Sequence, residues 1–151
     1  MGYRFLPLAL VIGLMGCKGS IDHDEISAAK SAAKFAQVAF VKRDFENGYA
    51  LLADSGKRYV SHEKFQETIS RLHPKAFPVS VTASEYEPMP GEKAIHIYLA
   101  GENSGERFYY RLTMEGAAGT GYKVARFYRG SEPYPGSGSR QKLKEPLTTK
   151  P

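Results

Sequence analysis

The chain has 151 residues, of which 25% are charged and 42% are hydrophobic when Tyr and Cys are included, an ordinary globular composition that suggests one domain. Its 21 Lys and Arg exceed its 16 Asp and Glu only modestly, so we expect attraction to anionic surfaces in general and no nucleic-acid partner. The single cysteine, Cys17, excludes an internal disulfide.

The first 16 residues have the features of a signal peptide. Arg4 and the α-amino group supply positive charge, and the apolar run that follows is too short to span a bilayer stably. This run ends in Leu14-Met15-Gly16-Cys17, which resembles the lipobox of bacterial lipoproteins. The resemblance implies cleavage before Cys17, a diacylglycerol on its thiol and a further acyl chain, such as palmitate, on the new amine.

This resemblance implies that residues 17–21 form a lipidated tether and that the protein lies in the cell envelope. Lys18 follows the cysteine, which by family analogy favours the periplasmic side of the outer membrane over the inner membrane in a Gram-negative cell. The alternative is an ordinary secretory signal in which the cysteine is incidental.

Three helices are predicted first in the mature chain. Asp22 is expected to cap the first helix, with Glu25 as its capping-box partner. Apolar residues then recur at spacings of three and four, which is typical of one buried helical stripe. This stripe consists of Ile26, Ala29, Ala33, Ala36 and Phe40.

The second and third helices are shorter. Asp44 is expected to cap the second, which should close near Ser55-Gly56. Ser61 is expected to cap the third, which must stop at His73-Pro74 because the residue before a proline disfavours the helical conformation.

Four strands should follow, separated by Gly- and Pro-containing turns, and such short connections indicate an antiparallel meander. Their predicted ranges are 78–87, 93–101, 106–115 and 121–129. Centring each hairpin on its turn pairs Leu99 with Phe108, Ile97 with Tyr110, Ile95 with Leu112, Tyr110 with Phe127 and Leu112 with Ala125. One face then collects Val79, Val81, Ala83, Ile95, Ile97, Leu99, Phe108, Tyr110, Leu112 and Phe127. Residues 131–151 are basic, rich in Pro, Gly and Ser, and expected to be disordered.

Helices followed by a curved antiparallel meander resemble the nuclear transport factor 2-like, or cystatin-like, α+β cone. The resemblance covers roughly residues 26–130, and its cues are Asp44-Phe45-Glu46, Tyr59-Val60-Ser61 and the segment 121–129. It implies an α+β domain over residues 22–130, in which three N-terminal helices pack on one face of a four-stranded sheet. Such cones serve as enzymes, lipoprotein domains and adaptors, so the fold alone names no activity.

No catalytic motif is found, and we expect neither a cofactor nor a metal. His62-Glu63-Lys64-Phe65-Gln66 begins like a zinc-protease helix, but Gln66 stands where the second histidine must be. If the cone instead encloses a small pocket, as in an enzyme or a small-ligand carrier, its candidate residues are Glu85, the one inward carboxylate by this register, and Tyr110.

The other face of the predicted sheet is our leading candidate for binding. The register places His96 opposite Arg111 and Arg111 opposite Arg126, and it lines up Tyr98, Tyr109 and Tyr128 beside them. Like charges directly opposite one another are destabilising, whereas Tyr and Arg are enriched at interfaces. The hypothesis is a non-catalytic binding or scaffold domain for an envelope protein, an anionic polymer or a second copy of itself. The alternative is a solvated sheet face, since Tyr and Thr form strands readily.

Overall fold

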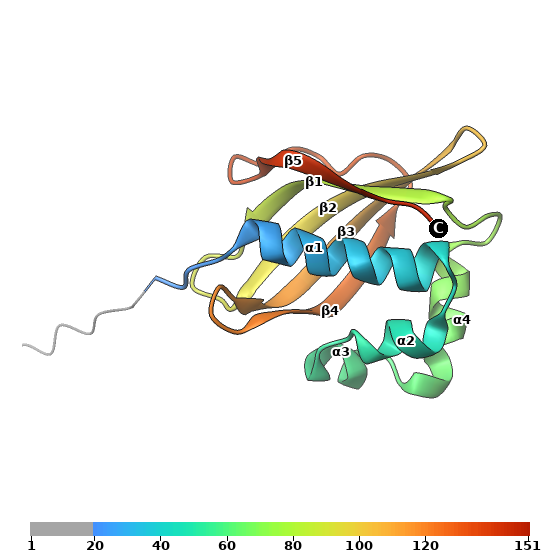
Figure 1. Ribbon diagram of the computed structural model, residues 1–151, viewed down its shortest axis with the longest axis horizontal. Helices are drawn as coiled ribbons and strands as arrows, with labels where there is room; N and C mark the ends of the chain where they lie inside the picture. The colour runs from blue at the N-terminus through green and yellow to red at the C-terminus, as the bar shows by residue number, and fades with distance from the viewer. Residues whose placement is uncertain (1–19) are drawn as a thin grey trace, which may run out of the picture.

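A computed structural model describes residues 20–151 of the chain. The predicted signal peptide 1–16, Cys17 and positions 18 and 19 lie outside the described residues. Residues 20–151 form an α+β fold with an open antiparallel sheet (Figure 1). No helix in this part of the chain is long and apolar enough to cross a membrane.

The described helices are more numerous than the three that were predicted. They are α1 (Glu25–Ala36), a π-helical turn η1 (Gln37–Val41), α2 (Phe45–Ala50), α3 (Asp54–Tyr59) and α4 (His62–Leu72). The expectation that Gly56 closes the second helix is wrong, because Gly56 lies inside the separate helix α3. A side chain there would come within 2.6 Å of the Val124 carbonyl, so this glycine permits close packing of α3 on the sheet.

Helix α1 begins at a different cap from the one expected. The Asp24 carboxylate, not that of Asp22, accepts from the Ser27 N–H at 2.9 Å. Asp22 instead uses its carbonyl, which accepts from the Ala118 N–H at 3.0 Å and so fixes the chain to the sheet. The predicted stripe is confirmed as buried at Ala29, Ala33, Ala36 and Phe40, whereas Ile26 is only partly buried.

The sheet has five strands in the order β4-β3-β2-β1-β5, with every neighbouring pair antiparallel. The strands are β1 (Ser80–Pro88), β2 (Ala94–Asn103), β3 (Glu106–Ala117), β4 (Gly121–Gly130) and β5 (Gln141–Thr149). The four predicted strands are confirmed within a few residues. Strand β5 was not predicted.

Strand β5 corrects the expectation that the whole tail, residues 131–151, is disordered. It pairs with β1 and buries Leu143 to 5% exposure. The basic, proline-containing composition of this segment was interpreted as disorder, but edge strands have the same composition. Lys142, Lys144 and Pro146 lie on a strand with one unpaired edge.

The predicted register is wrong by two residues. Leu99 lies opposite Tyr110, Ile97 opposite Leu112, Ile95 opposite Met114 and Leu112 opposite Phe127. The β2–β3 turn consists of only Ser104 and Gly105, both with positive φ, rather than four residues. Because a shift of two preserves the faces, the predicted inward residues are buried, except for Val79, which precedes β1 and is 51% exposed.

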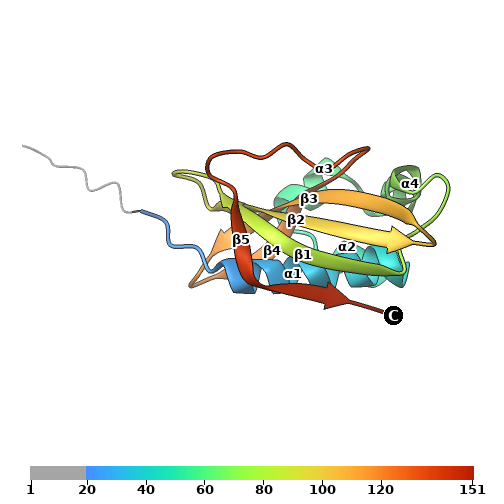
Figure 2. The same ribbon diagram turned by 90° about the horizontal axis from the view of Figure 1, so that it is seen from above.

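The two faces of the sheet are covered differently. Helix α1 lies along one face, whereas the connection from β4 to β5 crosses the other (Figure 2). Helices α2, α3 and α4 gather beside β4 (Figure 1), whose outer edge is closed by the bond from the Ala53 N–H to the Val124 carbonyl at 2.8 Å. The helices therefore build the core on one side, and the opposite side, here called the outer face, carries the candidate site.

Candidate binding site on the outer face of the sheet

A cross-strand row of Tyr98, Arg111 and Tyr128 forms the centre of the outer face. The predicted opposition of Arg111 to both His96 and Arg126 is wrong, because those two residues face Thr113 in the next row. The two-residue shift thus replaces a repulsive cationic pair by an arginine flanked by two tyrosines.

Arg111 is held by aromatic rings rather than by a counter-charge. Its guanidinium carbon lies 5.2 Å from the centre of the Tyr128 ring and 5.4 Å from that of Tyr134. Its Nε is buried and has no hydrogen-bond partner among residues 20–151, and no carboxylate of this range pairs with it. A buried donor without an acceptor is costly. The Arg111 side chain as a whole is only partly buried, so an anion can approach its guanidinium charge, although not the covered Nε.

The β4–β5 connection, residues 131–140, supplies residues that the sequence analysis missed. Arg140 Nε lies 3.1 Å from Glu85 Oε2, and the Arg140 guanidinium carbon is 4.4 Å from the Tyr98 ring centre. The Tyr134 ring meets Tyr98 at 65° and 5.7 Å. The only sequence signal for this docking was one aromatic residue, Tyr134, among prolines and glycines.

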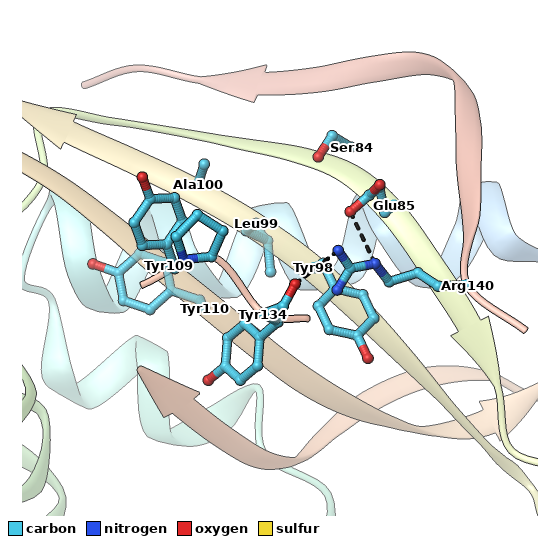
Figure 3. A pocket seen from close by; sticks show the side chains of 10 residues that line it. Ser84, Glu85, Tyr98, Leu99, Ala100, Tyr109, Tyr110, Tyr134 and Arg140 are labelled. Carbon is cyan, nitrogen blue, oxygen red and sulfur yellow. Dashed lines mark hydrogen bonds and ion pairs between the residues drawn. The ribbon is translucent and has the colours of Figure 1, made fainter. Parts of the chain in front are cut away.

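Glu85 lies on the outer face, which corrects the prediction of an inward carboxylate. A bulge at Ser84 shifts the pairing, so that Ala83 faces Leu99 whereas Glu85 faces Tyr98. One extra residue in a strand reverses the side on which the next side chain projects. The bulge therefore places Glu85 where it can pair with Arg140 (Figure 3).

A small cavity of about 170 Å³ lies beneath the connection. Figure 3 shows that side chains from β1, β2 and β3 meet there with the connection, and the lining residues are Ser84, Glu85, Tyr98, Leu99, Ala100, Tyr109, Tyr110, Pro133, Tyr134 and Arg140. Cavities of roughly 150 Å³ hold a molecule of the size of benzene. The space thus fits one small group and not an extended polymer.

The surroundings set the charge of the site. Burial raises the pKa of the Tyr98 and Tyr134 phenols, so both are neutral at pH 7. Hydrogen bonds, above all from the Ser137 hydroxyl at 2.6 Å, lower the pKa of Glu87 and keep it ionised. Burial and the nearby Arg111 lower the pKa of His96, which is therefore neutral at pH 7.

Two other predicted residues are used in different ways. Tyr109 faces Ala100 and lines the cavity. The Arg126 guanidinium donates to the carbonyls of Ala125 and Ser55, at 2.7 Å and 3.3 Å, which turns it toward helix α3. Arg126 therefore fastens α3 to the sheet and lies away from the Arg111 row.

Tyr110, the other residue of the alternative interior pocket, belongs to a buried pair with His73. The His73 Nδ1–H donates to the Ile69 carbonyl at 2.8 Å, so Nε2 must accept from the Tyr110 hydroxyl at 2.7 Å. Burial lowers the pKa of His73 to about 4 and raises that of Tyr110. The Tyr110 phenol points to His73 and Glu85 lies on the outer face. The two residues therefore line the same cavity beneath the connection and do not form a pocket inside the core.

The histidine of the zinc-like sequence meets one carboxylate in the structure. His62 Nε2 lies 2.7 Å from Glu46 Oε2 at an exposed position. Residues 20–151 contain no group of three His, Cys, Asp or Glu side chains placed to hold a metal ion.

No protein-family model, curated protein or solved structure matches this chain.

Proposed function

We propose that this protein is a lipid-anchored cell-envelope protein whose domain binds an anionic group on a partner and performs no catalysis. The lipobox-like Leu14-Met15-Gly16-Cys17 supports the anchor. Five residues span at most about 18 Å, so a lipid on Cys17 would hold Asp22 within that distance of the membrane surface. The Asp22 carbonyl is bonded to Ala118, and therefore the β3–β4 turn would lie near the bilayer.

Arg111 is the single observation that carries the binding proposal. Its charge lies between the Tyr128 and Tyr134 rings without a carboxylate, and its buried Nε has no acceptor among the described residues. A carboxylate or phosphate on an envelope protein or polymer would pair with the guanidinium charge, because charge-assisted bonds to guanidinium are strong. A second copy of the chain could offer the same group through Glu132, an exposed carboxylate beside the site.

Cross-linking in intact cells tests this proposal. The full acylated protein should capture a defined partner, and Arg111→Gln should lose it. The matched control is Arg107→Gln, which removes an exposed arginine four residues away on the same strand. If Arg111→Gln captures the same partner in the same amount, the outer-face assignment is wrong. Mass spectrometry of the processed chain tests the anchor independently, since an unmodified thiol on Cys17 would refute it.

The cavity favours a second candidate, a small-ligand carrier of the nuclear transport factor 2-like type. Its space of about 170 Å³ lies under the β4–β5 connection and is lined by Tyr98 and Tyr109. The cone-like resemblance is supported by five antiparallel strands beside α1. Native mass spectrometry of protein purified from its own cells should then show a bound small molecule that Tyr109→Trp, which fills the space, displaces.

A further inference from the structure

A basic groove runs between α1–η1 and the second half of β5, on the side of the sheet opposite the candidate site. It encloses about 740 Å³. Lys30, Lys34 and Lys42 line its helical wall, and Leu147 and Thr149 line its strand wall. None of the residues that line it is acidic. We call this surface the lysine groove.

The three lysines form no close ion pair among the described residues, although Lys30 and Lys42 are near enough to Asp24 and Asp44 to help lower the pKa of those carboxyls. All three are exposed, and none forms an ion pair with a carboxylate of residues 20–151. Lys30 and Lys42 are 12 residues apart, which is about 18 Å along a helix. The positive charge therefore extends along one continuous line rather than at a single point.

Between the lysines the groove carries apolar residues beside the polar Gln37, Thr148 and Thr149. Ala33 is only 4% exposed, and Val38 and Leu147 are partly exposed along the same groove. Lysine stems lie well on such a surface while their ammonium groups reach outward. A line of exposed lysines is attracted electrostatically to anionic lipid headgroups.

The position of the groove fits the proposed anchor. Lys30 lies six residues after the N-cap Asp24, which is about 9 Å along α1. The proposed lipid on Cys17 lies at most about 18 Å of chain before Asp22. The first lysine of the groove is therefore within reach of the membrane surface that would hold the lipid.

We propose that the lysine groove lies on anionic phospholipid headgroups. This inference rests on the proposed lipid anchor, which a basic surface would reinforce as the second of two membrane signals. The contact turns α1 and β5 toward the bilayer. Because α1 and the β4–β5 connection lie on opposite sides of the sheet (Figure 2), the Arg111 site then faces away from the membrane, toward its partner.

Vesicle sedimentation tests this orientation without the lipid anchor. The probe is the chain from Lys18 to Pro151, which contains every described helix, strand and core residue. It should sediment with vesicles of phosphatidylcholine mixed with phosphatidylglycerol and not with phosphatidylcholine alone. Each lysine near an anionic surface contributes roughly fivefold in affinity, so Lys30→Glu with Lys34→Glu should weaken binding at least about 30-fold.

The control variant carries Lys64→Glu and Lys75→Glu, which change the net charge equally at exposed positions on and after α4. It should bind far more tightly than the groove variant. Equal binding to both kinds of vesicle, or equal weakening by both variants, would overturn the proposal. So would binding to soluble polyglutamate but not to vesicles, which would assign the groove to an acidic polymer. Since this chain lacks Cys17, a failed anchor and a failed groove give separate results.

Discussion

Acidification from pH 7 to pH 5 should lower the free energy of unfolding by about 2 kcal/mol through His73 alone. The imidazole of His73 is 4% exposed, and burial lowers its pKa to about 4. In the unfolded chain the pKa returns to its ordinary value of 6.5. Between pH 6.5 and pH 4, His73 is therefore protonated in the unfolded chain but remains neutral in the native state.

This difference in proton uptake decides whether the free energy of unfolding rises or falls with pH. Stability rises with pH wherever the unfolded state binds more protons, so the native state is favoured above pH 6.5 and loses stability progressively toward pH 4. The full difference is about 2.5 pKa units, or about 3 kcal/mol. The Arg129 guanidinium beside His73 acts in the same direction, whereas the Glu106 carboxylate opposes it.

Urea unfolding at pH 7, 6 and 5 would measure this loss. The double variant His73→Leu with Tyr110→Phe replaces both hydrogen-bonded partners by apolar groups, so no buried polar side chain of the pair remains unpaired. Between pH 7 and pH 5, the free energy of unfolding of this variant should fall by about 2 kcal/mol less than that of the natural chain. The single change His62→Gln, at an exposed histidine, should retain the loss. The same pH dependence in the natural chain and the double variant would refute the reasoning.

Three further changes test the corrected fold. Leu143→Ala should lower the free energy of unfolding by about 2–3 kcal/mol in urea, because it opens a cavity under β5, and no loss at all would mean that this segment is not packed. Asp24→Ala should lower Tm more than Asp22→Ala does, because the Asp24 carboxylate is the one that caps α1; the reverse order would contradict this cap. Gly116→Ala should cost clearly more stability than Gly91→Ala. Both have positive φ, but only at Gly116 would a side chain meet backbone, and equal losses would argue against that contact.

Much of the fold could be predicted from local sequence patterns. The alternation of apolar residues in strands β1 to β4 determined which side chains are buried, because strand side chains project to opposite faces with a period of two. The alanine spacing of α1 likewise predicted its buried stripe. Both patterns survive small errors in strand or helix boundaries, and so these predictions held.

The exact pairs and the composition of the site could not be predicted in this way. A two-residue turn at Ser104-Gly105 moved the β2–β3 register by two, which put Tyr98 beside Arg111 in place of His96. The β3–β4 pairing, whose register shifts between Thr113 and Met114, put Tyr128 there in place of Arg126. A bulge at Ser84 sent Glu85 to the outer face. Such shifts depend on the backbone conformation at single positions. The residue pattern of the neighbouring strands is compatible with more than one pairing register.

The sequence by itself determined the helices-then-strands order of residues 22–130 and the buried face of the sheet, because both depend on neighbours along the chain. The lipid attachment at Cys17 depends on neighbours in the same way and stays a prediction. Only the tertiary structure decided that β5 completes the sheet and that Tyr134 and Arg140 return to the outer face. Those contacts join residues that are 23 to 68 positions apart. Pairing at an existing strand edge can order a segment whose composition alone lacks the hydrophobicity to fold.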